Sequence, residues 1–208
     1  NWSHNFDWTL NYYGNLVEIV NPQGRMIRFI DTDDTPSGVN WVLDGDTSTP
    51  FELVENTFVA FLLGDPENQR IYRFEYPGFG ETLGSLESVK DTHGNTHTVT
   101  ISNDLPTQVS DGLGRTLTFS YNGSELTSVS DGTRTVDFVH AGGHLRTVTD
   151  ARGSTTTYTY DGGVITGLLA NKTRPEGNAP LTQTFDAEGR VLTQTDSDGN
   201  TTSLSYAE

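Results

Sequence analysis

The sequence predicts an all-β protein made of tandem antiparallel β-hairpins, with no significant helix. Short alternating runs rich in Val, Thr, Tyr and Phe recur along the chain, separated by Gly, Asn and Asp, which is typical of strands joined by tight turns. No segment carries apolar residues at the helical spacing with capping residues at its ends. A short motif, in which glycine follows an acidic residue by three positions, also returns about every twenty residues.

Residue usage changes along the chain and predicts two continuous parts. All three Trp residues lie within the first 80 residues, whereas Thr is concentrated after residue 80. We therefore expect residues 1–80 to form an aromatic-rich N-terminal β cap. Residues 81–208 are expected to form tandem hairpin repeats that continue directly from this cap.

Two stretches of the N-terminal part need separate interpretation. Residues 51–63 are predicted to be two strands on either side of Glu55-Asn56-Thr57. The strand that follows Gly24 carries apolar residues on both of its faces: Met26, Ile27, Phe29 and Ile30. Because side chains of a strand alternate between its faces, we expect this strand to be covered on both sides.

The recurrent motif places an acidic residue at the start of a turn and glycine near its end. The copies are Asp91 with Gly94, Asp111 with Gly114, Asp131, Asp150 with Gly153, and Asp196 with Gly199. Asp131 heads a unit that is one residue shorter, with Thr133 where glycine is expected. An early copy and a degenerate one are Asn21 with Gly24 and Arg174 with Gly177. The aspartate can accept a backbone N–H from two residues further on, and the glycine tolerates the positive φ of a type I turn with a bulge.

An alternating strand follows each of the complete turns. After Gly114, Phe119 and Tyr121 share one face of the strand, while Thr116, Thr118 and Ser120 share the other. The pairs Tyr158/Tyr160 and Leu204/Tyr206 fall in register with the first pair. Stacked repeats are therefore predicted to carry an aromatic ladder on one face of the sheet and a hydroxyl ladder on the other.

The repeated Asp-x-x-Gly-Arg/Asn followed by an aromatic strand resembles the YD repeats of Rhs-type proteins. Tyr160-Asp161 and its variants Tyr121-Asn122 and Phe185-Asp186 belong to the same pattern. The opening from Trp2 to Leu10, which leads to Pro22-Gln-Gly24-Arg25, is similar to the start of an Rhs repeat region. The resemblance covers essentially all 208 residues. It implies a curved strip of hairpins that coils into a β-shell, as in Rhs proteins, insecticidal toxin complexes and teneurins.

The same resemblance implies a function and a location. Shells of this type enclose or display another part of the polypeptide, often a C-terminal toxin in bacteria, so the implied partners are flanking repeats and C-terminal cargo of the same chain. The implied location is exported, extracellular or on the cell surface, and we expect this sequence to be a piece of a longer protein. The protease-like core motif with its Asp-Pro-x-Gly element is absent from the sequence, as is any recognisable toxin domain. We therefore expect a non-catalytic structural segment with no catalytic residues.

Charge and composition exclude several other functions. The chain has 12 Lys and Arg against 28 Asp and Glu, a net charge of −16, which opposes binding to nucleic acid or to anionic lipid. Its longest apolar run, Phe58 to Leu63, is far shorter than the roughly 20 residues of a membrane helix, so no membrane insertion is expected. Cysteine is absent, which removes disulfides, thiol nucleophiles and Cys-based metal sites.

Aromatic residues near the N-terminus support an alternative function. Aromatic faces suit the apolar C–H patches of sugar rings. The candidates for such contacts are Trp2, Trp8, Tyr12, Tyr13 and Trp41. Filling of the core is the competing role for these side chains. The alternative function is therefore a carbohydrate- or protein-binding adhesion module that recognises a glycan or a protein on a cell surface.

One loop has the opening pattern of a calcium site, with Asp196, Asp198 and Asn200 as candidate ligands. An EF-hand loop counted from Asp196 would have glycine at position 201 and glutamate at position 207, where this chain has Thr201 and Ala207. We therefore predict an ordinary hairpin turn and no required cofactor, with a weak, open calcium site as the alternative. His93 and His97 lie in a predicted turn and the strand after it, so they are not predicted to bind a metal.

Overall fold

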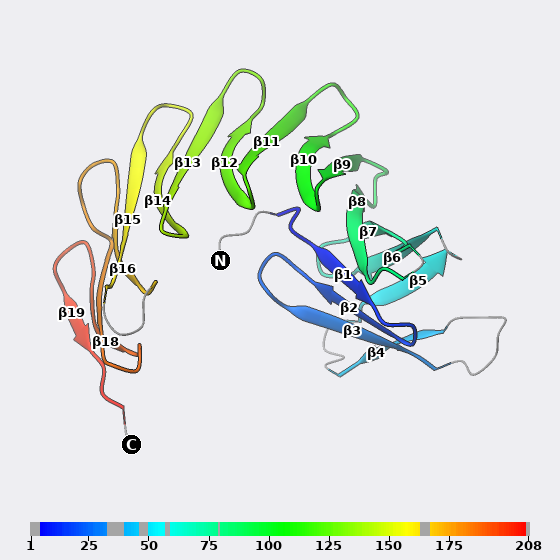
Figure 1. Ribbon diagram of the computed structural model, residues 1–208, viewed down its shortest axis with the longest axis horizontal. Coiled ribbons are helices and arrows are strands. Elements are labelled where there is room, and N and C mark those ends of the chain that lie inside the picture. The colour runs from blue at the N-terminus through cyan, green and yellow to red at the C-terminus, as the bar shows by residue number, and fades with distance from the viewer. Residues whose placement is uncertain are drawn as a thin grey trace. The chain divides into compact units, whose positions relative to one another are not determined.

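The computed structural model describes residues 5–32, 40–45, 50–56, 59–78, 80–162 and 167–206. These residues form β-strands and no helix, and the paired strands run antiparallel throughout (Figure 1). The predicted fold class is confirmed. In the described ranges there is accordingly no helix long and apolar enough to cross a membrane. The chain forms two compact units, Asn1–Thr118 and Phe119–Glu208, and the expected change of character at residue 80 stays a prediction.

The first unit contains two series of consecutive strand pairs. One series is β1 (Thr9–Tyr12), β2 (Leu16–Val20), β3 (Met26–Asp31) and β4 (Trp41–Asp44). The other is β5 (Glu52–Asn56), β6 (Ala60–Asp65), β7 (Arg70–Glu75), β8 (Leu83–Asp91), β9 (Thr96–Ser102), β10 (Leu105–Ser110) and the start of β11 (Thr116–Asn122), which continues into the second unit. The two strands predicted within residues 51–63 are confirmed as β5 and β6.

Strand β8 joins the two series, because its two halves pair with different strands. Residues 83–85 pair with β1, whereas residues 86–91 pair with β7, and β9 pairs with the same later part. Gly84 lies in the part that pairs with β1, opposite Leu10 and close to the change of partner. A Cβ atom at this position would be 2.5 Å from the Glu75 carbonyl oxygen, closer than any real side chain approaches backbone. Glycine is therefore required here by the close approach of two backbone segments.

The core of the first unit lies between two layers of strands, β1–β4 and β5–β8. Its buried apolar side chains include Leu10, Val17, Ile19, Ile27, Phe29, Leu53, Phe61, Leu63, Phe74 and Leu86. Aromatic rings meet across the layers, with ring centroids 5.6 Å apart for Tyr12 and Phe61 and 5.9 Å apart for Trp41 and Phe61. The Trp41 indole nitrogen also donates a hydrogen bond to the Glu55 carboxylate at 3.1 Å. Burial of these rings away from water supplies the main driving force for packing the layers together.

The expectation that the strand after Gly24 is covered on both faces is wrong. In β3, Ile27 and Phe29 are buried against the second layer, but Met26 is 53 % exposed and Ile30 is 39 % exposed. A two-layer unit covers only the inner face of each sheet, so the outer apolar side chains of β3 stay in contact with solvent. The apolar pattern of this strand showed that it can be buried but not how many layers would cover it.

The second unit is a meander in which consecutive strands pair. It contains β12 (Glu125–Ser130), β13 (Thr135–Ala141), β14 (His144–Thr149), β15 (Thr155–Tyr160), β16 (Leu169–Thr173), β17 (Leu181–Phe185), β18 (Val191–Thr195) and β19 (Thr201–Ser203). Each pairs with the next along the chain. Among its described residues, the buried apolar side chains are Phe119, Leu145 and Tyr158. This unit therefore relies on its backbone ladder more than on an apolar core.

The two faces of this meander differ in the way the alternating sequence predicts. Pairing places Thr149 opposite Thr155 and Thr195 opposite Thr201, and their hydroxyl oxygens are hydrogen-bonded at 3.0 and 2.8 Å. Tyr158 lies on the other face and is buried. The hydroxyl ladder links neighbouring strands through side chains as well as through the backbone.

Candidate functional site

The complete repeat turns use their aspartates in one way. In the Asp150 turn, the carboxylate Oδ1 accepts the backbone N–H of Arg152 at 2.8 Å and of Ser154 at 2.9 Å, and Gly153 has a φ of +85°. The same pair of bonds, to the residues two and four positions ahead, is made by Asp91, Asp111, Asp186 and Asp196. The geometry is the one that the sequence motif predicts: an acceptor at the first turn position and positive φ at the glycine.

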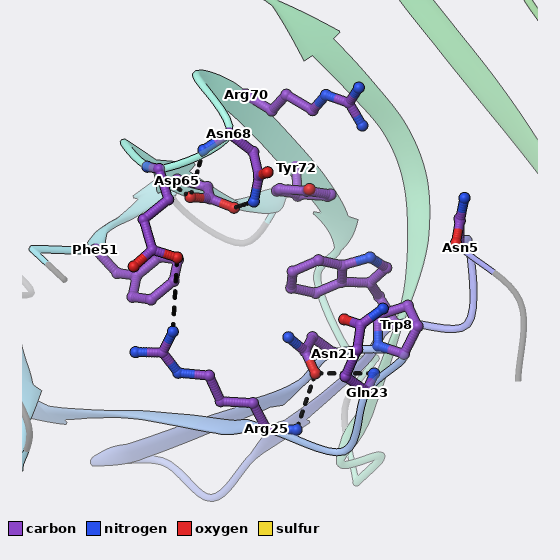
Figure 2. Close-up of a pocket in the computed structure, with 12 residues that line it drawn as sticks. Asn5, Trp8, Asn21, Gln23, Arg25, Phe51, Asp65, Asn68, Arg70 and Tyr72 are labelled. Atoms are coloured by element: carbon purple, nitrogen blue, oxygen red, sulfur yellow. Dashed lines mark hydrogen bonds and ion pairs between the residues drawn. The ribbon is translucent and has the colours of Figure 1, made fainter.

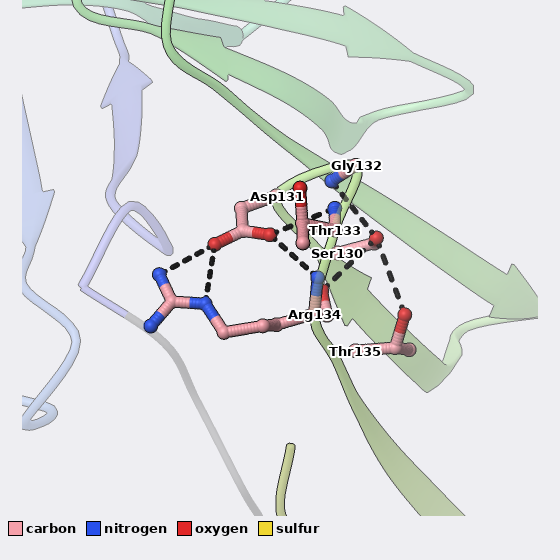
Figure 3. Close-up of polar contacts among 6 residues, drawn as sticks. All are labelled: Ser130, Asp131, Gly132, Thr133, Arg134 and Thr135. Carbon is pink, nitrogen blue, oxygen red and sulfur yellow. Dashed lines mark hydrogen bonds and ion pairs between the residues drawn. The ribbon is translucent and has the colours of Figure 1, made fainter.

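The shorter turn at Asp131 reaches a similar result with one residue fewer (Figure 3). Its Oδ1 accepts the backbone N–H groups of Thr133 at 3.0 Å and Arg134 at 2.7 Å. Gly132 has a φ of +86° and so supplies the positive φ that was expected at Thr133. The Arg134 guanidinium donates to Oδ2 at 2.6 and 2.9 Å, which adds an ion pair to the turn.

Two further turns show which part of the motif the backbone needs. The Arg174 turn has no aspartate at its first position, yet the Arg174 N–H donates to the Asn178 carbonyl at 2.9 Å and Gly177 has a φ of +85°. The turn from Asp186 to Gly189 has the full motif but was not among the predicted turns, although Phe185-Asp186 was assigned to the YD pattern. It connects β17 to β18, so it lies at the opposite ends of the strands from the Asp150 and Asp196 turns. It therefore falls outside the twenty-residue period. Its Asp-x-x-Gly-Arg pattern was the signal that could have found it.

The N–H groups around these carboxylates keep them ionised. The backbone N–H groups of Ser154 and Arg152 hold the pKa of Asp150 below its ordinary value. At Asp131, the backbone N–H and the guanidinium of Arg134 lower the pKa to about 2. Hydrogen bonds donated to a carboxylate stabilise its charged form, so these groups act as charged acceptors that close their own turns.

The predicted calcium ligands are arranged as in the other turns. Asp196 accepts backbone N–H groups from Asp198 and Asn200, both at 2.9 Å, and the Asn200 side-chain nitrogen donates to its Oδ2 at 3.0 Å. Asn200 therefore turns its amide nitrogen, not its oxygen, toward the carboxylate. In the part of the chain that the structure describes, no three acidic or histidine side chains are grouped as metal ligands. The calcium site stays a hypothesis.

A separate feature of the first unit is a cavity of about 360 Å³ between the β2–β3 turn and the β6–β7 turn (Figure 2). These turns belong to different layers of the unit. The lining residues are Asn5, Trp8, Asn21, Pro22, Gln23, Arg25, Phe51, Asp65, Glu67, Asn68, Arg70 and Tyr72. The size lies within the range of small-molecule sites in proteins.

Aromatic rings form the apolar part of the cavity wall. Trp8 and Tyr72 lie with their ring centroids 4.1 Å apart and their planes tilted by 33°. Tyr72 is buried, whereas Trp8 is half-buried beside the cavity (Figure 2). On the other side, the Arg25 guanidinium lies over the Phe51 ring at 5.1 Å and pairs with Glu67 at 3.7 Å. The wall thus combines an aromatic pair with charged and polar groups.

The two turns that border the cavity are held by their own side chains. Asp65 is buried, and its carboxylate accepts the backbone N–H groups of Glu67 and Asn68 at 3.0 and 3.1 Å and the Asn68 side-chain nitrogen at 2.8 Å. In the β2–β3 turn, Asn21 Oδ1 accepts two backbone N–H groups at 3.0 and 2.8 Å. A buried carboxylate that accepts three N–H groups has its hydrogen-bonding needs met, so Asp65 stabilises the β6–β7 turn that borders the cavity.

The five aromatic candidates from the sequence do not gather in one place. Trp8 lines the cavity, whereas Tyr12 and Trp41 pack in the core against Phe61. Tyr13 is 51 % exposed and does not line the cavity, and Trp2 lies outside the described residues. Tyr72, the ring that contacts Trp8, was not among the predicted candidates. Nothing local in the sequence marks it, because its role depends on the packing of β7 against the first layer.

The fold and the recurrent turns define the chain as a tandem β-hairpin repeat protein. Residues 140–179 match the family model described as RHS Repeat. This match supports the Rhs/YD-repeat assignment over the matched stretch, which includes the Asp150 turn, Tyr160-Asp161 and the Arg174 turn. No curated protein matches the chain in sequence.

Proposed function

We propose that this chain is a non-catalytic structural segment of a large exported or cell-surface Rhs/YD-repeat protein. Its hairpins form part of a β-shell that encloses or displays another part of the same polypeptide, such as a toxin. The observation that carries this proposal is one turn geometry repeated at Asp91, Asp111, Asp150 and Asp196 along a continuous series of hairpins. Such repetition builds surface area by adding units, as expected of a wall and not of a catalytic centre.

The burial pattern of the second unit gives independent support. Strands β12, β16, β17 and β18 carry no fully buried residue. Repeats bury apolar surface against neighbouring units, so a meander with this little burial is expected to gain further contacts from flanking repeats or from the enclosed cargo. The charged groups that recur in the turns are already used as hydrogen-bond acceptors, which supports a structural role for them.

The test uses the natural full-length polypeptide that contains this segment. Mass spectrometry of the native product is expected to show a chain much longer than 208 residues, with a part that resists limited proteolysis until the hairpins are disrupted. Gly153→Val strains the Asp150 turn and is expected to expose that part, whereas Gly162→Ala, at a glycine without positive φ, serves as the matched control. A native product no longer than this segment, or equal protease sensitivity in all three proteins, would contradict the proposal.

A second candidate function is an adhesion module that binds a glycan or a protein on another cell. The specific observation in its favour is the cavity beside Trp8 and Tyr72. A ligand that binds only the folded chain must raise its melting temperature, so a thermal-shift series with glycans distinguishes this function from a purely structural one. No shift with any glycan at high concentration would leave the structural role as the better account.

A further inference from the structure

The hairpin tip between β11 and β12 carries the sequence Asn122-Gly123-Ser124. It is the one place in the 208-residue sequence where glycine directly follows asparagine. All three residues of the tip are exposed, and a Cβ at Gly123 would meet no atom within 4 Å. Water therefore reaches this tip, and the space around it leaves room for a change in covalent structure.

An asparagine followed by glycine can react with its own backbone. The Gly123 nitrogen attacks the Asn122 carboxamide carbon and loses its proton to water, a C–N bond forms, and the carboxamide nitrogen leaves as ammonia. The product is a five-membered succinimide, which water opens at either of its two carbonyl groups to give aspartate or isoaspartate. The net change is uptake of one water and release of one ammonia. Glycine favours the reaction because it has no Cβ to crowd the attacking nitrogen.

Both reacting groups are available at this tip. Among the described residues, the Asn122 carboxamide makes no hydrogen bond, and the Gly123 N–H donates none. The attack therefore does not have to break an existing interaction of either group. Both groups also lie at the end of a hairpin, where local motion of the backbone is easiest.

The Asp-Gly step at Asp131 shows how the fold occupies the same groups elsewhere. The Gly132 N–H donates to the Ser130 hydroxyl at 3.1 Å (Figure 3), and the Asp131 Oδ1 accepts backbone N–H groups from further along the turn. The lowered pKa of Asp131 also keeps its carboxyl group ionised, and a carboxylate is a poorer electrophile than a carboxamide. The Asp111 turn repeats these hydrogen bonds. In both turns the attacking nitrogen and the attacked carboxyl group are already engaged.

A second exposed asparagine at a hairpin tip differs in the residue that follows it. Asn103 lies between β9 and β10, and the next residue is Asp104. The Asp104 side chain crowds its own backbone nitrogen, and its negative charge opposes loss of the N–H proton. Asn103 is therefore expected to react far more slowly than Asn122, and it provides a comparison within the same molecule.

We propose that Asn122 is a site of spontaneous deamidation, at which the folded chain converts to aspartate and isoaspartate as it ages. Each conversion adds one negative charge to a chain whose net charge is −16. The aspartyl product follows Tyr121 just as Asp161 follows Tyr160, so it keeps the residue types of the repeat. The isoaspartyl product lengthens the main chain by one methylene group at the tip that joins β11 to β12. The proposal holds for a structural segment and for an adhesion module alike.

The test follows the folded chain by intact mass and peptide mapping while it is held at about pH 8 and about 37 °C. A mass gain of about one dalton is expected at Asn122 before any other asparagine, with isoaspartate and aspartate distinguished by electron-transfer fragmentation. Asn122→Gln is expected to remove this gain, because the longer side chain would have to close a six-membered ring. Asn103→Gln is the matched control and is expected to leave the gain unchanged.

The same chain in guanidinium chloride gives the rate of the unfolded state, and circular dichroism confirms that each variant is folded without it. Folding is expected to slow conversion of Asn122 by less than about tenfold, and stronger protection would overturn the proposal. Earlier conversion at Asn103 or at another asparagine would also overturn it. Asn122-Gly123-Ser124 fits the acceptor pattern for N-glycosylation as well, so a natural product with a saccharide on the Asn122 nitrogen would contradict free deamidation there.

Discussion

The two compact units use the same strands and turns but bury apolar surface to different extents. In the first unit two layers of strands enclose Phe29, Phe61 and Phe74, all with no exposed surface. In the second unit, Leu145 is the one large side chain among the described residues that is buried to the same degree. The comparison teaches that the hairpin repeat by itself specifies a ladder of backbone hydrogen bonds between strands. An apolar core forms only where a second layer of strands covers one face of the sheet.

The second unit has additional side-chain contacts between neighbouring strands. The Tyr160 hydroxyl donates to the Leu145 carbonyl oxygen at 2.9 Å, and the Tyr206 hydroxyl donates to the Val191 carbonyl at the same distance. The Arg190 guanidinium also lies over the Tyr206 ring at 4.8 Å. These contacts are local and partly exposed, so we expect the second unit to open more readily than the first.

The largest expected effect comes from removing a core ring of the first unit. Phe61→Ala is expected to cost about 3–5 kcal/mol of unfolding free energy, because it deletes a fully buried ring between the layers. Val148→Ala, in the half-buried β14 strand of the second unit, is expected to cost about 1 kcal/mol. Urea denaturation followed by circular dichroism measures both losses. Equal losses of unfolding free energy in the two variants would contradict the distinction between a first unit with a buried two-layer core and a second unit held mainly by its backbone hydrogen bonds.

A glycine pair tests the turns of the second unit at an intermediate magnitude. A Cβ at Gly153 or Gly162 meets no atom within 4 Å, but only Gly153 has a positive φ, at +85°. Gly153→Ala is therefore expected to cost about 1 kcal/mol through backbone strain alone. Gly162→Ala is expected to be neutral or slightly stabilising. Similar melting temperatures for the two variants would show that positive φ does not hold the repeat turn.

The turn aspartates are expected to have a smaller, pH-dependent effect. Because the folded-state pKa of Asp150 is lowered, its ionised form favours folding above the unfolded pKa of about 3.9. That contribution is lost as the pH falls through the lower folded pKa. Asp150→Ala is therefore expected to lower the melting temperature by a few degrees at pH 7, with the difference from the wild type closing toward pH 2.

Asp150→Asn is the matched control for this prediction. Asn21 already accepts two backbone N–H groups in the equivalent β2–β3 turn. The Asp150→Asn variant is therefore expected to keep the turn and to lose only the pH-dependent part of the stability that Asp150 contributes. Melting curves between pH 2 and pH 7 compare the three proteins. A difference between Asp150→Ala and the wild type that stays constant over this range would contradict the assigned role of the charge.

Chelation is expected to have the smallest effect. Asp196 in the second unit and Asp91 in the first both accept a side-chain N–H from the asparagine four residues ahead, at 3.0 and 2.7 Å. Since protein donors fill both sites in the same way, EDTA is expected to leave the melting temperature of the chain unchanged. A calcium-dependent fall of more than roughly 10 °C would establish calcium as a structural ligand. Loss of that dependence in Asp196→Asn would locate the ion in this turn.

Much of the fold could be predicted because its signals are short. The turns at Asp91, Asp111 and Asp150 were found from residues that lie within five positions of one another, and their hydrogen bonds span the same distance. The two strands within residues 51–63 also followed from local alternation. The Asp186 turn was missed because it was sought by its period and not by its pattern.

The cavity could not be predicted to the same extent. Trp8 was one of five aromatic candidates, and nothing in the sequence separated it from Tyr12 and Trp41, which pack in the core. Tyr72 and Asp65 were not singled out, because their places follow from the packing of β6 and β7 against the first layer. The exposed outer face of β3, with Met26 and Ile30, was mispredicted for the same reason.

The sequence by itself determined where the chain turns and which face of each strand is apolar. An aspartate that accepts nearby N–H groups and a glycine that tolerates positive φ act within one turn, so their effect does not depend on the rest of the molecule. The tertiary structure decided how the strands meet: β8 pairs with β1, with Thr9 opposite Ser85, and so connects the two layers. That choice joins residues far apart in the chain, and it depends on burial of apolar surface between whole layers, which no short pattern encodes.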